Sequence, residues 1–198
     1  MSWLADMYIT LVPGIAAGIL NMVWCTLPWA RRLARPIDAG RTWRDGRRWF
    51  GDNKTWKGLI GMTGLGLVCT LAWSRVCAAA PALEARVYFY SDHANTLAYN
   101  TVIGLAIGLA YALFELPNSF LKRRLDIAPG HGSARTPGRG VLFVILDQID
   151  SIIGLVLVVA VVHPLTIGFF LLYILVGGVT HALLNLLLFA ARLRKNPL

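Results

Sequence analysis

Five long apolar stretches divide the chain, and polar, mostly basic segments separate them. They cover approximately Tyr8–Ala30, Leu59–Ala80, Thr96–Leu116, Val141–Val162 and Leu165–Ala190. Each is long enough to cross a bilayer as a helix, which takes about 20 apolar residues. Isolated strands cannot satisfy their backbone hydrogen bonds in lipid. The pattern therefore predicts an all-α, polytopic membrane protein with about five transmembrane helices, in which residues 1–198 form a single integral-membrane domain.

The distribution of basic residues predicts an orientation. Seventeen of the 19 Lys and Arg residues fall in residues 31–58, residues 117–140 and the C-terminal tail, and only Arg75 and Arg86 fall on the opposite side. Positive charge concentrates on the cytoplasmic side of membrane proteins. We expect the N-terminus outside, the C-terminus in the cytoplasm and cytoplasmic loops at about 31–58 and 117–140, in a cell (inner or plasma) membrane. The opposite connections, residues 81–95 and the His163–Pro164 turn, are expected to be simple linkers.

Composition agrees with a membrane protein and excludes a soluble nucleic-acid-binding domain. The chain is 57% hydrophobic and 15% charged, and its net charge of +9 lies between apolar spans. No nucleic-acid partner is expected. Cys25, Cys69 and Cys77 lack the spacing of zinc ligands and are expected to be packing residues.

Small and polar residues inside the spans favour helix packing. Gly14 and Gly18, and likewise Gly104 and Gly108, have the four-residue spacing that lets helices approach closely in lipid. Packing is a simpler explanation than phosphate binding. His181 and Asn185 lie one turn apart on the last span, where they could form interhelical hydrogen bonds or line a polar cavity.

Two acidic residues interrupt the fourth span. Asp147 and Asp150 are three residues apart, so they lie on one helix face. A carboxylate inside a spanning segment costs about 2.5–3.5 kcal/mol on insertion scales, and two adjacent ones resist ionising together unless positive charge lies between them. One carboxylate could pair with an Arg while the other is solvated. The alternative, which we favour, is a divalent-metal site at the membrane surface.

The two basic loops add candidate phosphate ligands. The segment 51–58, GDNKTWKG, places Gly, Asp and Asn beside Lys54 and Thr55 just before a helix, which suits a phosphate. It is not a Walker A loop, and attraction of lipid headgroups explains its charge equally well. In the second loop, Lys122 and Arg123 could be ordinary positive-inside residues, and His131 a solvated residue or a general base.

These features together suit nucleotidyl transfer to a lipid. Mg²⁺ is commonly held by one or two carboxylates plus substrate phosphates, and Lys and Arg cover the remaining phosphate charge. A site at the membrane face implies a lipid as second substrate. A terminal lipid phosphate is mostly dianionic at neutral pH, because its second pKa is about 6. Such a nucleophile needs positioning and charge neutralisation more than a strong general base.

Four motifs resemble those of the CDP-archaeol synthase family, the short five-span relatives of the phosphatidate cytidylyltransferases. The motifs, which follow in the family's order, are residues 36–40 (PIDAG), 51–58 (GDNKTWKG), 118–124 (NSFLKRR) and 147–150 (DQID). The resemblance implies CTP and a membrane lipid phosphate as substrates, Mg²⁺ as cofactor, and a CDP-lipid and pyrophosphate as products for phospholipid synthesis. The acceptor would be an archaetidic-type ether lipid phosphate or phosphatidic acid.

The resemblance also implies roles for individual residues. Asp147 and Asp150 would hold the metal, and Lys122 would act beside them at the catalytic centre. CTP and phosphate binding would fall to Asp52, Asn53, Lys54, Thr55, Lys57, Arg123 and Asp38. The role of Asp38 within this set is open.

Several questions stay open at this point. Gln148 replaces an Arg of the larger cytidylyltransferases, and Ala39 replaces a frequent glycine. Whether Asp126, Glu115 or His131 joins the site is undecided, as is the oligomeric state. The competing hypotheses are a small cation-conducting or transporting membrane protein that uses Asp147 and Asp150, and a non-catalytic scaffold that binds anionic headgroups.

Overall fold

The computed structural model describes residues 2–128 and 137–192, and all named secondary-structure elements over these ranges are helices. The long helices are α1 (Ser2–Thr26), α2 (Trp56–Ala78), α4 (Leu97–Arg124), α5 (Pro137–Val162) and α6 (Ile167–Ala190). The short ones are η1 (Arg31–Leu33), α3 (Pro81–Glu84) and η2 (Tyr88–Tyr90). The five long helices are all long and apolar enough to span a membrane, which confirms the predicted fold class. The orientation of the termini stays a prediction.

Three of the long helices begin at a threonine cap. The hydroxyls of Thr55, Thr96 and Thr166 accept hydrogen bonds from the backbone N–H three residues later, at 3.1, 3.3 and 3.3 Å. Such caps satisfy N–H groups that a helix start leaves without partners. Capping therefore fixes where α2, α4 and α6 begin.

The helix bounds differ most from the expected spans at α1 and at the end of α4, and α5 also begins earlier, at Pro137 instead of Val141. Helix α1 is shifted towards the N-terminus and ends at Thr26, because Pro28 disfavours helical conformation in the residue before it. Helix α4 continues through Pro117 to Arg124, so Lys122 and Arg123 lie on a helix and not in the predicted loop 117–140. An internal proline is tolerated in a membrane helix where neighbouring groups compensate for the lost hydrogen bond.

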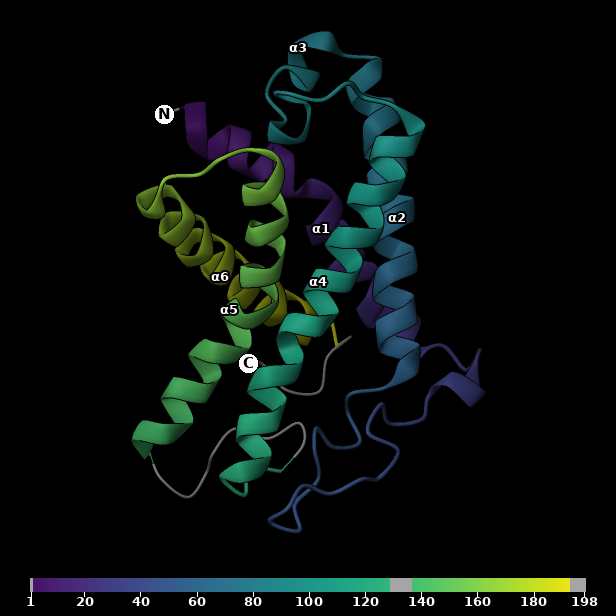
Figure 1. Cartoon of the computed structure of the whole chain (residues 1–198), viewed down its shortest axis with the longest axis vertical. Helices are drawn as coiled ribbons and strands as arrows, with labels where there is room; N and C mark the ends of the chain where they lie inside the picture. Colours follow the sequence, from purple (N-terminus) through teal and green to yellow (C-terminus); the bar gives the residue numbers. More distant parts are fainter. Residues whose placement is uncertain (1, 129–136, 193–198) are drawn as a thin grey trace.

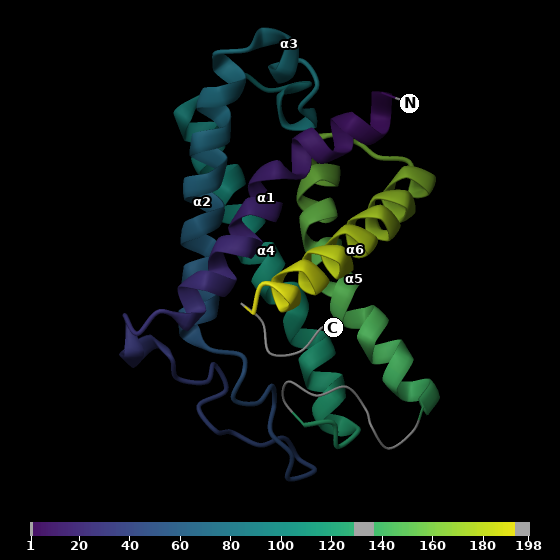
Figure 2. The same cartoon turned by 180° about the vertical axis from the view of Figure 1, so that it is seen from behind.

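Helices α2 and α4 pack in direct backbone contact and run side by side in both views (Figure 1, Figure 2). A Cβ added at Gly108 would lie 2.4 Å from the Met62 carbonyl oxygen, and one added at Gly66 would lie 2.7 Å from that of Gly104. This confirms the packing role predicted for Gly104 and Gly108. The first pair differs, because Gly14 and Gly18 face the side chains of Leu155 and Tyr111.

The connection 81–95 was expected to be a simple linker, and this prediction is wrong. It folds into a cap, here called the α3 cap, over one end of the bundle (Figure 1). Val87 and Phe89 are 1% and 3% exposed, and the Tyr88 backbone N–H donates to the Thr10 hydroxyl at 3.0 Å. Apolar side chains alternating with hydrogen-bonded tyrosines explain why the segment is ordered.

The opposite end of the bundle carries the long loop 27–55 and the last turns of α4 (Figure 1). Cys25, Cys69 and Cys77 are all free, and of the three Cys77 alone is buried. Because the loop 27–55 and the last turns of α4 lie together, their polar motifs gather at one end of an apolar bundle, here called the basic end.

Candidate active site

The acidic pair is held together by one amide. Asn118 on α4 donates through Nδ2 to Asp147 Oδ1 at 2.7 Å and to Asp150 Oδ2 at 2.8 Å, both on α5. The two helices can approach because Gly154 has no side chain, and a Cβ there would lie 2.6 Å from the Ala110 carbonyl oxygen. The two carboxylates therefore converge on one point, as their spacing predicted.

Lys122 supplies the positive charge at this point. Its Nζ lies 2.6 Å from Asp147 Oδ1 and also contacts Oδ2, and it lies 5.9 Å from the centre of the Phe143 ring. Asp150 accepts a further hydrogen bond from the Ser151 backbone N–H at 2.6 Å. The sequence left open that one of the two carboxylates pairs with an arginine. The structure shows such an ion pair at Asp147, but the partner is a lysine.

A second lysine reaches the site from the loop. Lys54 forms an ion pair with Glu115 on α4, one turn before Asn118. Burial would lower the pKa of Lys54, but the carboxylates of Glu115, Asp150 and Asp147 together raise that pKa above its usual value. Lys54 therefore stays charged at neutral pH.

A cavity with several polar side chains in its wall, here called the polar cavity, lies beside this ion pair. It encloses about 860 Å³ counted out to its open edge, and its wall includes Asn53, Lys54, Thr55, Glu115 and Tyr111. Three of the predicted CTP ligands thus line one space. The Thr55 hydroxyl already caps α2 through the Gly58 N–H.

Asp38 organises the loop. It accepts hydrogen bonds from Arg48 at 2.6 and 3.2 Å and from the backbone N–H groups of Gly40, Phe50 and Gly51 at 3.0 to 3.1 Å. Burial alone would raise the pKa of Asp38, but the Arg48 and backbone hydrogen bonds hold that pKa well below its usual range. Its observed contacts are structural and lie within the loop.

Two other predicted ligands lie away from the cavity. The Lys57 ammonium donates to the carbonyls of Cys25, at 3.1 Å, and Leu27, so it caps the end of α1. Asp52 is bonded to Arg48 at 3.0 Å, and its side chain is 75% exposed. The structure does not bring either side chain to the acidic pair.

Arg123 is buried on α4, and its Nε has no hydrogen-bond partner among the described residues. A buried guanidinium with a free donor is available to an anion. It remains a candidate phosphate ligand.

The sequence left open whether Asp126, Glu115 or His131 joins the site, and the three residues have different outcomes. Glu115 joins the site through Lys54, whereas Asp126 lies 2.6 Å from Arg47 and ties the loop to the end of α4. His131 lies outside the described residues. The signal missed in the sequence is the spacing of Glu115, Asn118 and Lys122, which places all three on one face of α4.

Helix α5 is also hydrogen-bonded to α6, through Gln148. Asn185 on α6 donates to Gln148 Oε1 at 2.7 Å, and His181 Nδ1 lies 3.1 Å from the Gln148 carbonyl oxygen. These contacts confirm interhelical hydrogen bonding for the α6 pair. They also link α5 to α6, while Asp147 and Asp150 on α5 face α4.

The acidic pair fits a hard divalent cation that shares its coordination with a substrate. Within the described ranges, no group of three or more His, Cys, Asp or Glu side chains could enclose a metal alone. The oxygens of its two carboxylates are ligands of the kind that Mg²⁺ prefers, whereas the Asn118 amide faces them through its Nδ2 donor and not through its oxygen. Substrate phosphates would complete the shell.

A sequence model of the family described as CarS-like CDP-archaeol synthase matches residues 19–197 of the chain. The chain belongs to the CDP-archaeol synthase family. Membership confirms the resemblance inferred from the four motifs. It also supports the predicted membrane cytidylyltransferase that consumes CTP and forms a CDP-lipid, and it gives no support to the cation-conducting alternative.

Individual relatives agree with this assignment. The CDP-archaeol synthase of Pyrococcus furiosus is 32% identical over 162 residues, 82% of this chain and 83% of that protein. That of Thermococcus onnurineus is 35% identical over 153 residues, 74% and 73% of the two chains. A solved structure of an intramembrane enzyme for archaeal membrane lipid biosynthesis superposes with a TM-score of 0.59 at 24% identity, over 94% of this chain and 92% of the other. That last likeness shows a shared fold.

Proposed function

We propose that this chain transfers the cytidylyl group of CTP to the phosphate of a membrane lipid at the α4–α5 site. A divalent cation, Mg²⁺ in the first instance, would be held by Asp147 and Asp150. An oxygen of the lipid phosphate forms a bond to the α-phosphorus of CTP. The bond from that phosphorus to the bridging oxygen of the β-phosphate breaks, and pyrophosphate leaves.

The observation that carries the proposal is the convergence of Asp147 and Asp150 on the Asn118 amide. Two carboxylates held this close, at a cost inside an apolar segment, favour a role that uses their combined charge. When bound, the cation would neutralise phosphate charge and help to orient the reacting groups.

The lysines would serve the anionic substrates. Lys122, now paired with Asp147, and Lys54, now paired with Glu115, are the ammonium groups at the two sides of the site. We expect each to exchange its carboxylate for a phosphate when substrates bind. Arg123 would add a third positive charge, and Asn53 and Thr55 would bind CTP through the cavity wall.

The site would face the cytoplasm, where CTP is available. The loop 27–55 and the end of α4 carry most of the described basic residues, and such residues favour the cytoplasmic side. The relatives are named CDP-archaeol synthases, so an archaeal ether lipid phosphate is the first acceptor to test.

The test is transfer of label from CTP labelled at the α-phosphate into the lipid phase by purified protein. The acceptors are an unsaturated archaetidic-type phosphate, its saturated form and phosphatidic acid. Asp147→Asn and Asp150→Asn should lose transfer, whereas Asp92→Asn should keep it, since Asp92 is exposed in the α3 cap. Label transfer by wild type to none of these lipids, or undiminished transfer by both Asn variants, would refute the proposal.

A further inference from the structure

A further cavity lies between the last turns of α2 and the first turn of α4, at the end of the bundle opposite the basic end. Figure 1 shows these ends of α2 and α4 next to the α3 cap. The cavity encloses about 820 Å³ counted out to its open edge, and its wall includes Leu71, Ser74, Arg75, Asn95, Leu97 and Asn100. It shares no lining residue with the polar cavity, so it is a separate space.

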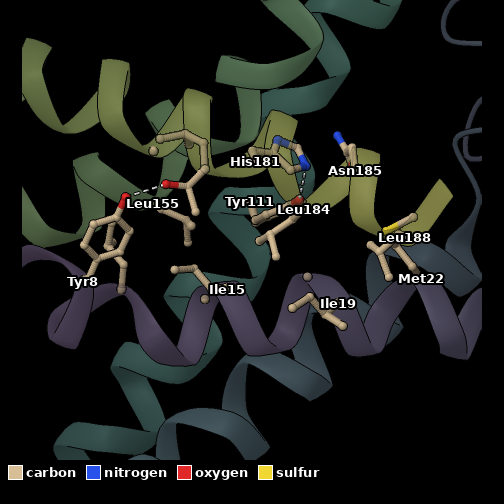
Figure 3. A pocket seen from close by; sticks show the side chains of 16 residues that line it. Tyr8, Ile15, Ile19, Met22, Tyr111, Leu155, His181, Leu184, Asn185 and Leu188 are labelled. Atoms are coloured by element: carbon tan, nitrogen blue, oxygen red, sulfur yellow. Dashed lines mark hydrogen bonds between the residues drawn. The ribbon is translucent and has the colours of Figure 1, made fainter. Parts of the chain in front are cut away.

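Charge distinguishes this cavity from the mostly apolar space between α1 and α6 (Figure 3). No Lys, Arg, Asp or Glu side chain is among the described residues that line that space, and the Tyr8 hydroxyl there shares a hydrogen bond of 2.7 Å with Thr180. The cavity beside the α3 cap has Arg75 in its wall instead. Because a guanidinium is always charged in proteins, this wall favours an anionic occupant.

The Arg75 guanidinium is available to such an occupant. It is exposed, and it makes no ion pair or hydrogen bond with the residues in 2–128 and 137–192. Arg86, the other arginine at this end, is by contrast paired with Asp6 at 2.6 Å. The negative end of the α2 dipole favours a cation at this position, but it leaves the guanidinium donors unused. Arg75 can therefore donate to an anion that enters the cavity.

A hydrogen-bond network holds the rest of the polar wall in place. Asn95 donates through Nδ2 to the Ser74 carbonyl oxygen at 3.0 Å and to Glu84 Oε2 at 2.6 Å. Asn100 donates to Asn95 Oδ1 at 2.6 Å and accepts from the Tyr90 hydroxyl at 2.9 Å. The Glu84 carboxylate is thus bonded to Asn95 and forms no ion pair with the arginine, whose charge it leaves uncompensated.

The position of Arg75 along α2 matches the headgroup level of a bilayer. Helix α2 begins at Trp56, which is 45% exposed, and Arg75 follows 19 residues later. That separation is a rise of about 28 Å at about 1.5 Å per residue, close to the thickness of a hydrocarbon core, about 30 Å. Tryptophan favours the membrane–water interface. With Trp56 at one interface, Arg75 lies at the other, where lipid phosphates are found.

We infer that this cavity binds the phosphate headgroup of an anionic phospholipid in the leaflet opposite the basic end. The planar guanidinium of Arg75 donates to the phosphate oxygens, a pairing that suits its geometry. The first methylene groups of the lipid chains contact Leu71 and Leu97. The bound lipid joins the end of α2 to the start of α4 and stabilises the helix pair. This inference does not rest on the function proposed above, because Arg75 takes no part in the α4–α5 site.

The test maps where an anionic lipid binds. Phosphatidylglycerol with a photoreactive group on its headgroup is added to the purified full chain in a non-ionic detergent, and crosslinked peptides are identified by mass spectrometry. Wild type should crosslink within residues 71–78 and 95–100. Arg75→Gln should lower crosslinking there by about tenfold, equivalent to about 1.4 kcal/mol. Arg86→Gln removes the same charge at the same end and is the matched control, because Arg86 does not line the cavity. Crosslinks at the basic end should be equal in all three proteins.

Two outcomes of this experiment overturn the inference. One is equal crosslinking of the cavity peptides in Arg75→Gln and Arg86→Gln. The other concerns the source of the phosphate. Excess unlabelled phosphatidylglycerol should displace the probe from the cavity peptides, whereas inorganic phosphate at the same concentration should not. Displacement by both would assign the cavity to free phosphate.

A second measurement does not depend on replacing Arg75. Ala78→Phe places a ring in the cavity, and Ala79→Phe is the matched control because Ala79 is an exposed neighbour that does not line it. Phosphatidylglycerol should raise the melting temperature of wild type and of Ala79→Phe by more than that of Ala78→Phe. An equal rise in all three proteins would place the stabilising lipid elsewhere and contradict the inference.

Discussion

Lys122 of α4 and Asp147 of α5 form an ion pair, with Nζ 2.6 Å from Oδ1. The two helices are apolar enough to span a membrane, so each charge compensates the desolvation of the other. Lys122 occupies the carboxylate that we assign to the divalent cation. It therefore competes with the cation in the absence of substrate and becomes a phosphate ligand in its presence.

This competition gives an unusual prediction for Lys122→Met. Removing the ammonium should tighten binding of Mn²⁺ to the substrate-free protein, because Asp147 loses its cationic partner. Turnover should fall by about 100-fold, equivalent to about 2.7 kcal/mol of transition-state stabilisation. Calorimetric titration with Mn²⁺ and label transfer test the two effects. Lys122→Arg, which keeps the charge, is the control, and weaker Mn²⁺ binding in Lys122→Met would contradict the competition.

The two lysines of the GDNKTWKG motif should separate into different roles. Lys54 lines the polar cavity, so Lys54→Met should weaken CTP binding by about tenfold or more, equivalent to about 1.4 kcal/mol. Combining it with Glu115→Gln removes the orphaned carboxylate and should not restore binding. Lys57 binds carbonyls at the end of α1, so Lys57→Met should chiefly lower the melting temperature. Equal losses of CTP affinity in the two single variants would show that this division is wrong.

Asp38→Asn should loosen the loop at every physiological pH. The pKa of Asp38 is lowered in the folded state, so its stabilising contribution is complete above about pH 4 and is lost only as the pH falls below that value. The variant should lose about 1–3 kcal/mol of loop stability, measured as faster proteolysis of residues 27–55, to the same extent at about pH 6 and about pH 8. A difference between variant and wild type that appears only at the lower of these pH values would contradict the assignment.

Gly108→Ala should destabilise the bundle, because the new Cβ would lie 2.4 Å from the Met62 carbonyl oxygen. Overpacking against backbone typically costs about 1–3 kcal/mol. Gly64→Ala is a matched control on α2, since nothing lies within 4 Å of its added Cβ. Thermal unfolding in detergent should show a lower transition for Gly108→Ala alone, and equal shifts in the two variants would argue against close α2–α4 packing.

Much of the fold follows from hydropathy, and part of the site follows from spacing. Five apolar stretches are enough to predict five helices, because lipid leaves the backbone few alternatives. Asp147 and Asp150 could be paired from their three-residue separation alone. The α3 cap could not be foreseen, because its order depends on contacts such as that of Tyr88 with Thr10, which are 78 residues apart.

The roles of polar residues were harder to predict than their presence. Lys54 and Lys57 look equivalent in the sequence, but the start of α2 turns one towards Glu115 and the other towards Cys25. Asp38 resembles a ligand until its five hydrogen bonds with Arg48 and the loop backbone are seen. Asn118 was visible as part of a motif, but its bridging role depends on how α4 packs against α5.

The central claim is that Asp147 and Asp150 hold the cation that supports cytidylyl transfer. The most direct measurement is the initial rate of label transfer from CTP to lipid as Mg²⁺ is titrated, in wild type, Asp150→Asn and Asp92→Asn. We expect Mg²⁺-dependent transfer in wild type and Asp92→Asn, and a rate at least about 100-fold lower in Asp150→Asn at saturating Mg²⁺, equivalent to about 2.7 kcal/mol. The same Mg²⁺ dependence and rate in Asp150→Asn as in Asp92→Asn would contradict the account.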